Sequence, residues 1–375
     1  MAENNIKKLA KLGQSVWLDD INRQIIQSGE LKHQIEDTGI RGVTSNPTIF
    51  QKAISGSDVY DDEIVNLLKQ GKQPAEVFQT VAVKDIQDAC DLFRPLYDET
   101  NGGDGFVSIE VLPSLARDLE GTLDNARTLW NAVERPNLMI KVPGTDEGAI
   151  ATKTLLTEGI NINITLLFSL KNYEAVARAY IEALQARHDK GESIDRLASV
   201  ASFFVSRVDT LADSQIDARL ESGDGDADLL KSLKGKVAIA NARLAYEKFE
   251  ELFKGDDFKA LADAGARVQR PLWASTGTKN PEYSDVLYVD TLIGPDTINT
   301  APPKTIEAFL DHGTVERTVD SDYAGAHKVF DDLKRAGLDI DQITQKLEDD
   351  GIESFIKSYD GLLDDVAGKR SLINA

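Results

Sequence analysis

The stretch LMIKV, residues 138–142, is the clearest indication of the fold class. Four of its five residues are apolar, and the turn sequence PGT follows directly at residues 143–145. A strand this apolar is typical of a parallel sheet that helices cover on both faces. The stretch INITLLF at residues 162–168 shows the same pattern, and a segment long enough for one helix separates the two. Parallel strands joined through a helix form a βα unit, so the sequence predicts an α/β fold.

Six further apolar runs alternate with helix-period segments along the chain. They are VWLD (16–19), GVTSN (42–46), FVSIEV (106–111), VASFFV (200–205), PLWAS (271–275) and VLYVDTLI (286–293). Eight strands close a (β/α)8 TIM barrel, whereas an open dinucleotide-binding sheet would carry GxGxxG after its first strand. We therefore expect residues 1–375 to form a single barrel domain, with extra N-terminal helices and a helical tail over about residues 304–375.

Composition and charge narrow the class of protein. Of the 375 residues, 41% are hydrophobic and 28% are charged, which is typical of a soluble globular protein. The net charge of −21 argues against a nucleic-acid partner, which would need basic patches. The polar N-terminal segment and the lack of a long apolar run predict neither a signal peptide nor a membrane span, and the single cysteine, Cys90, suits a reducing cytoplasm.

Polar residues recur near the carboxyl ends of the expected strands, where a TIM barrel keeps its active site. They are Asp19, Asn46, Glu110, Lys141, Asn163, Thr165, Ser202, Arg207 and Ser275. A strand covered on both faces should not hold a charge without a partner. Together these residues predict one site in the mouth of the barrel.

Lys141 lies inside an otherwise apolar strand, and two interpretations are about equally supported. Its stem could lie in the core while the amine reaches water. Alternatively, a lysine enclosed in a low dielectric loses its charge more readily, and the neutral amine becomes a nucleophile toward a carbonyl carbon. Glu110 and Asp19 would then supply proton transfer for imine chemistry.

Seven segments in order along the chain resemble the transaldolase family, in particular its longer bacterial form. They are VWLDD (16–20), GVTSNPT (42–48), VSIEV (107–111), LMIKVPGT (138–145), NINITLLFS (161–169), SFFVSRVD (202–209) and LWASTGTK (272–279). The resemblance implies a (β/α)8 barrel of the class I aldolase type. It also implies a transferase of the non-oxidative pentose phosphate pathway, which moves a dihydroxyacetone unit from sedoheptulose 7-phosphate or fructose 6-phosphate to glyceraldehyde 3-phosphate or erythrose 4-phosphate.

The resemblance also implies roles for individual residues. Lys141 matches the family's Schiff-base lysine, and Asp19 matches the general acid/base of C3–C4 cleavage. Glu110 and Thr165 match the pair that holds a proton-shuttling water. Because the lysine amine itself provides the electron sink, we expect neither a metal nor an organic cofactor.

Further matches concern substrate binding. They are Asn46 and Asn163 for substrate hydroxyls, Ser202 near the imine, and Arg207 and Ser275 for the phosphate. The shorter transaldolases carry an arginine two residues beyond this serine, whereas this chain has Gly277 there and Lys279 as the nearest cation. Either Arg207 or Lys279 could therefore dominate phosphate binding.

Two alternatives remain open from the sequence. One is a fructose 6-phosphate aldolase-type lyase on the same scaffold, and the other is a non-catalytic phosphosugar-binding protein. The expected partners are small-molecule sugar phosphates rather than nucleic acid or membrane, and the sequence leaves monomer and homodimer equally open.

Overall fold

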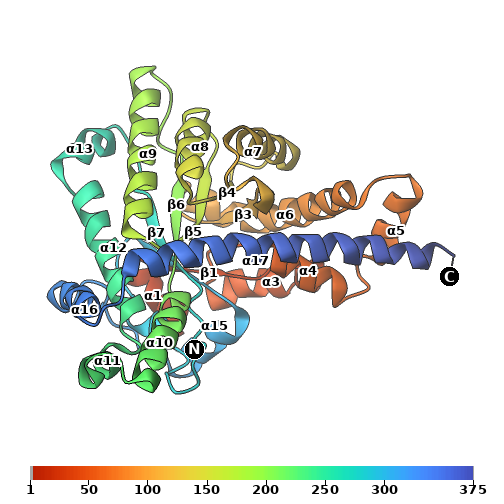
Figure 1. Cartoon of the computed structure of the whole chain (residues 1–375). Helices are drawn as coiled ribbons and strands as arrows, with labels where there is room; N and C mark the ends of the chain where they lie inside the picture. The colour runs from red at the N-terminus through yellow and green to blue at the C-terminus, as the bar shows by residue number, and fades with distance from the viewer. Residues whose placement is uncertain (1–2, 375) are drawn as a thin grey trace.

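A closed barrel of eight parallel strands forms the centre of the computed structural model, which describes residues 3–374 (Figure 1). The strands are β1 (Gln14–Leu18), β2 (Gly42–Val43), β3 (Phe106–Glu110), β4 (Leu138–Pro143), β5 (Ile162–Leu167), β6 (Ser199–Phe204), β7 (Arg270–Ala274) and β8 (Thr297–Ala301). Each strand pairs in parallel with the next, and β8 pairs with β1. The predicted (β/α)8 TIM barrel is confirmed.

The eighth strand was predicted in the wrong place. Residues 286–293 hold the short helix α14 (Leu287–Asp290) and the turn after it, and the buried Tyr288 and Val289 of the helix account for part of the apolar pattern. The strand itself is TINTA at residues 297–301, and it was missed because its pattern is polar. Asn299 in that strand is buried and accepts a hydrogen bond from the Thr276 hydroxyl at 2.8 Å.

Helices alternate with the strands and extend the chain beyond the barrel. They are α1 (Asn5–Lys11), α2 (Arg23–Gln27), α3 (Glu30–His33), the π-helix η1 (Gln34–Thr38), α4 (Pro47–Ser55), α5 (Asp61–Lys69), α6 (Pro74–Glu99), the 3₁₀ turn η2 (Pro113–Leu115), α7 (Leu119–Val133), α8 (Asp146–Thr157), α9 (Leu170–Asp189), α10 (Ser206–Ser222), α11 (Ala227–Leu233), α12 (Val237–Phe253), α13 (Asp256–Asp263), α15 (Pro303–His312), α16 (Tyr323–Arg335), α17 (Ile340–Gly368) and the 3₁₀ turn η3 (Lys369–Asn374). None of the helices described is long and apolar enough to cross a membrane.

Short polar side chains begin several helices immediately after a strand. Thr145 follows β4 and accepts a hydrogen bond from the Gly148 amide at 3.0 Å, while Ser169 follows β5 and accepts one from the Asn172 amide at 3.0 Å. Such N-caps satisfy amides that have no partner inside the helix. They fix where each strand ends and therefore which residues reach the barrel mouth.

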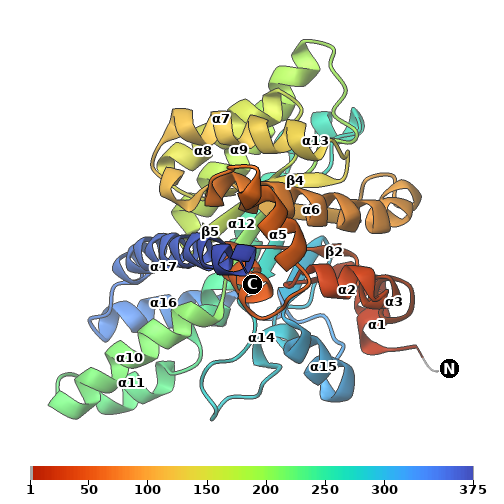
Figure 2. The same cartoon turned by 90° about the vertical axis from the view of Figure 1, so that its right-hand side faces the viewer.

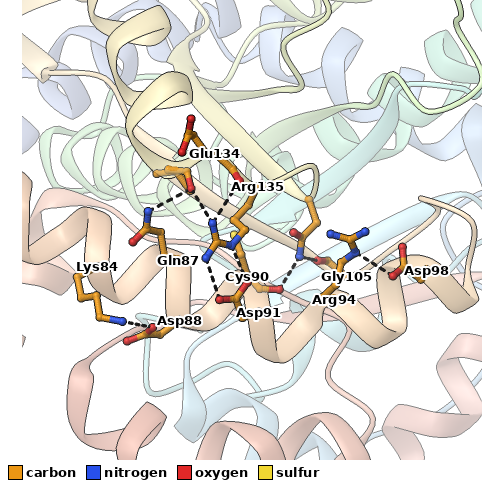
Figure 3. A network of polar contacts seen from close by, with 12 residues as sticks. Lys84, Gln87, Asp88, Cys90, Asp91, Arg94, Asp98, Gly105, Glu134 and Arg135 are labelled. Atoms are coloured by element: carbon orange, nitrogen blue, oxygen red, sulfur yellow. Dashed lines mark hydrogen bonds and ion pairs between the residues drawn. The ribbon is translucent and has the colours of Figure 1, made fainter.

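A polar network joins α6 and the end of α7 to the entry of β4 (Figure 3). Arg135 donates two hydrogen bonds to the Asp91 carboxylate, at 2.6 and 3.0 Å. The fully buried Asn137 amide donates to the backbone carbonyls of Cys90 and Gly105, each at 2.9 Å. Because these contacts hold the chain just before β4, they help to set the position of the strand that carries Lys141.

The long helix α17 crosses the molecule and packs against α4, α6, α10 and the end of β5 (Figure 1). Its C-terminal end lies beside α5, as the view in Figure 2 shows. The predicted tail is therefore helical, and its longest helix lies against the barrel.

Candidate active site

A cavity of about 300 Å³ lies at the carboxyl ends of the strands. It is lined by eight of the residues predicted for the site, namely Asp19, Asn46, Lys141, Thr165, Ser202, Arg207, Ser275 and Lys279. The other two predicted residues lie directly behind this lining, since Glu110 contacts Lys141 and Asn163 contacts Ser202. The structure thus brings all ten together from β3, β4, β5 and β6, from the start of α10, and from the segments directly after β1, β2 and β7.

Lys141 is enclosed at the centre of β4, with 4% of its surface exposed. Its Nζ donates a hydrogen bond to the backbone carbonyl of Ser45 at 2.8 Å and lies 3.2 Å from Glu110 Oε2. The snorkelling interpretation does not describe this geometry, because the amine faces the inner cavity rather than the outer surface. Its partners instead hold the nitrogen at a fixed point.

Glu110 ends β3 with its carboxyl group buried beside this amine. Burial raises the pKa of Glu110, while the Lys141 ammonium lowers it and the charge of Asp19 raises it further. Apart from the ion pair, neither Glu110 oxygen has a hydrogen-bond partner among residues 3–374, and the same is true of the buried Thr165 hydroxyl. One of these unsatisfied groups lies beside the amine and the other lines the same cavity as the amine, and buried polar groups without a protein partner are suited to hold a water.

Asp19 follows β1 at the edge of the cavity, and its backbone amide donates to the Ala301 carbonyl at the end of β8. The Thr44 hydroxyl donates to Asp19 Oδ1 at 2.7 Å, and that hydroxyl also lies 2.7 Å from the Thr300 hydroxyl. Thr44, directly after β2, therefore orients the carboxylate, and Thr300 of β8 contacts Thr44 in turn. Its second oxygen has no hydrogen bond from within residues 3–374, which leaves it able to accept a proton.

The three amide and hydroxyl residues are held by different neighbours. Asn46 caps α4 by accepting from the Ile49 amide at 3.0 Å, which directs its remaining amide group toward the cavity it lines. Asn163 accepts from the Ser202 hydroxyl at 2.7 Å and donates to the Ser108 hydroxyl at 3.1 Å. This chain of hydrogen bonds crosses β3, β5 and β6 and fixes the orientation of each group.

Arg207 begins α10 directly after β6 and lies over the Phe204 ring, 5.2 Å from its centroid. No ion pair or hydrogen bond holds its guanidinium among the described residues, and burial lowers its pKa while Asp19 raises it. Lys279 lies in the loop after β7 and is exposed. Water therefore screens the charge of Lys279 more than that of the partly buried Arg207.

Two residues beside the cavity have a strained backbone. Leu166 in β5 has a φ of 56° and lies at the irregularity where the β5–β6 register shifts. Ser275, directly after β7, also has a φ of 56°. Left-handed backbone at residues other than glycine costs about 1–3 kcal/mol and concentrates at functional sites. Here it turns the chain immediately after Thr165 and presents Ser275 to the cavity.

A family model described as "Transaldolase/Fructose-6-phosphate aldolase" matches residues 16–366 of the sequence. The chain belongs to this family. The match begins at the first barrel strand and ends near the C-terminus of α17, so the helical tail is part of the family pattern.

Proteins of the family from several bacteria match this chain over nearly their full length. The "Transaldolase" of Trichodesmium erythraeum is 48% identical over 373 residues, which cover 98% of each chain. The "Transaldolase 2" of Nostoc sp. is 45% identical over 379 residues and 100% of each chain. The "Transaldolase" of Mycolicibacterium smegmatis is 46% identical over 371 residues and 98% of each chain.

Several cavity residues of this family member escaped the sequence analysis. They are Thr44, Lys52, Phe204 and Thr300, together with Phe355 of α17. Thr44 lies in GVTSN and could have been found by applying the strand-end rule to every polar residue of that segment. Phe355 gave no signal, because an apolar residue in a helix predicts only packing.

The lining carries four cationic side chains, Lys52, Lys141, Arg207 and Lys279, against one acid, Asp19. The chain has a net charge of −21, but the lining of the cavity carries more positive than negative side chains, which suits an anionic ligand. Within the described residues, no group of three or more His, Cys, Asp or Glu side chains is arranged to hold a metal ion.

Proposed function

We propose that the cavity carries out the transaldolase reaction through a Schiff base on Lys141. The family membership and the full-length relatives named transaldolase support the transfer reaction. One observation carries the residue assignment: a lysine with 4% exposure lies 3.2 Å from a buried carboxylate and lines a cavity at the barrel mouth. This is the environment in which a lysine amine becomes a nucleophile.

Imine formation begins with a proton transfer from Lys141. Because burial raises the pKa of Glu110, this carboxylate can take the proton from the ammonium and leave a neutral amine. The amine attacks the C2 ketone of the ketose phosphate, and a water held by Glu110 and Thr165 returns the proton to the departing hydroxyl. Loss of water gives the iminium.

Carbon–carbon cleavage then depends on Asp19. Its carboxylate removes the proton of the C4 hydroxyl, the C3–C4 bond breaks, and its electrons move into the iminium to give an enamine. The aldose phosphate leaves, and the enamine of dihydroxyacetone adds through C3 to the acceptor aldehyde as Asp19 returns the proton. Hydrolysis of the new imine frees Lys141 for the next turnover.

Substrate binding is divided between the two sides of the cavity. Asn46, Asn163 and Ser202 supply amide and hydroxyl groups for the carbon atoms near the imine. Arg207, Ser275 and Lys279 lie where a phosphate at the far end of the sugar would bind, and the less exposed Arg207 supplies most of the binding energy.

We further infer that the substrates are the sugar phosphates of the non-oxidative pentose phosphate pathway and that the protein acts in the cytoplasm, as a monomer or homodimer. The cationic cavity supports an anionic sugar, and the buried free Cys90 suits a reducing compartment. The packing of α17 against α4, α6 and α10 supports a single domain that includes the tail.

Borohydride reduction with fructose 6-phosphate tests the assignment. The expected product is a three-carbon adduct on the peptide that contains Lys141, detected by mass spectrometry. Lys141→Arg should give no adduct, whereas Lys153→Arg, a change at an exposed lysine on α8, should react like the wild type. An adduct on another lysine, or none in folded protein, contradicts the proposal. Turnover that does not require erythrose 4-phosphate contradicts transfer.

A further inference from the structure

The inward face of α17 is a row of residues about one helical turn apart. They are Glu348, Gly351, Phe355, Ser358 and Tyr359. Residues with this spacing lie on one side of a helix. Their contacts show that this side covers the mouth of the barrel.

Both ends of this row are attached to the barrel by polar contacts. The buried Glu348 accepts hydrogen bonds from the Asn172 amide at 2.7 Å and from Arg117 at 3.3 Å. Ten residues further along α17, the Ser358 hydroxyl lies 2.8 Å from the Thr48 hydroxyl of α4. The helix therefore bridges the cavity from the α9 side to the α4 side.

Gly351 brings the helix backbone close to the site between these attachments. A Cβ atom at this position would lie 3.0 Å from Leu166 Cδ2 and 3.8 Å from Arg207 Nη1. Glycine inside a helix is destabilising by about 0.5–1 kcal/mol relative to alanine. Here it permits a close approach to Leu166 of β5, because a Cβ atom would crowd that side chain, and it places the helix backbone near Arg207.

Phe355 lies one turn beyond Gly351 and lines the same cavity as Lys141 and Arg207. It is 4% exposed, and together with Ile49 and Phe204 it makes up the large apolar part of the lining. We propose that Phe355 keeps bulk water away from the enamine and so directs the reaction toward transfer rather than release of dihydroxyacetone. This inference rests on the proposed function, because it concerns the intermediate on Lys141.

The chemistry explains why this shielding matters. An enamine that takes a proton from water at C3 becomes the iminium of dihydroxyacetone and leaves hydroxide. Addition of hydroxide at C2, followed by departure of the amine, releases dihydroxyacetone and restores Lys141. The net reaction is cleavage of the ketose phosphate to dihydroxyacetone and an aldose phosphate, with no acceptor used. An apolar side chain from the helix that crosses the cavity restricts the access of bulk water, which is the proton source for this side reaction.

The test is the ratio of dihydroxyacetone released to product transferred, measured at one fixed concentration of erythrose 4-phosphate. We expect Phe355→Ala to raise this ratio by about tenfold. A modest fall in the barrier to protonation of the enamine is enough to change the partitioning between release and transfer by that amount. Phe355→Leu preserves most of the apolar volume and should give a smaller rise.

Leu362→Ala provides the matched control, since Leu362 is a fully buried residue of α17 outside the cavity lining. It should lower the free energy of unfolding and leave the ratio at the wild-type value. The inference is overturned if folded Phe355→Leu and Phe355→Ala both keep the wild-type ratio, or if Leu362→Ala raises the ratio equally. Wild-type protein that neither forms the Lys141 adduct nor transfers would instead overturn the proposed function.

Discussion

Glu110 shows how one residue's surroundings set its chemistry. Its carboxyl group is buried, its oxygens lack hydrogen-bond partners among the described residues apart from the ion pair, and the Lys141 amine lies 3.2 Å away. Burial raises its pKa, so the carboxylate becomes a base only above the usual range for glutamate. A group that changes protonation nearer to neutral pH is a more effective proton shuttle.

Glu110→Gln is therefore expected to lower kcat by roughly 10²–10⁴-fold, the usual contribution of a general acid–base group. The raised pKa also gives the sign of the pH dependence: wild-type kcat/KM should rise with pH as Glu110 loses its proton, and this acid limb should vanish in the variant. Steady-state kinetics across pH measures both. Glu120→Gln, at an exposed glutamate of α7, should change neither. An unchanged acid limb would show that another group is titrating.

Residue positions were predictable where the barrel rule applies and unpredictable where distant chain segments meet. Lys141, Glu110 and Asp19 lie at or beside the cavity, as expected from the rule that barrel active sites form at the carboxyl ends of the strands. The Ser45 carbonyl beside Lys141 was not predictable, because backbone groups carry no sequence signal. Phe355 was missed because only the folded position of α17 brings it to the cavity.

At the scale of elements, hydrophobic pattern predicted seven strands and failed at the eighth. The segment 286–293 is apolar because it packs as a helix and turn, whereas β8 buries the polar residues Thr297, Asn299 and Thr300. Polar strand residues become possible when neighbours satisfy them, as Gln14 does by donating to the Thr297 hydroxyl at 2.9 Å. Such pairings form only when the barrel closes, so a short stretch of sequence does not predict them.

Asp209 links three helices and gives a pH prediction at this scale. Located on α10 two residues after Arg207, it accepts from the Ala238 amide of α12 at 2.7 Å and from the Tyr288 hydroxyl of α14 at 2.9 Å. Burial raises the pKa of Asp209 to about 6. Because this pKa is higher in the folded than in the unfolded state, the folded state binds the proton more tightly, and protonation stabilises it. This stabilisation is fully present below the unfolded-state pKa and is lost as the pH rises through about 6.

Relative to Asp209→Asn, wild-type protein should therefore gain on the order of 1 kcal/mol of unfolding free energy between pH 7 and pH 5. Urea unfolding of both proteins at each pH measures this difference, and the asparagine keeps the shape of the side chain. Asp226→Asn, at the exposed N-cap of α11, is the comparison and should show no such trend. A constant wild-type-to-variant difference across this range would mean that Asp209 keeps its charge.

At the scale of the whole molecule, two electrostatic effects oppose each other. The net charge of −21 repels a phosphorylated sugar at long range, whereas Lys52, Arg207 and Lys279 attract it at the cavity. Salt screens the long-range repulsion more than the attraction at the cavity, because the Debye length falls from about 30 Å at 0.01 M to about 10 Å at 0.1 M. Contacts made inside the cavity, at hydrogen-bonding distance, are screened less.

We therefore expect kcat/KM for fructose 6-phosphate to rise between about 0.01 and 0.1 M salt, as the long-range repulsion is screened. It should then fall toward about 1 M, where the Debye length of roughly 3 Å weakens the cavity's own attraction. Fructose, which lacks the phosphate, is the control substrate and should show neither change. A monotonic fall from the lowest salt would mean that the local cations outweigh the −21 net charge even at long range, and that they steer the substrate from solution.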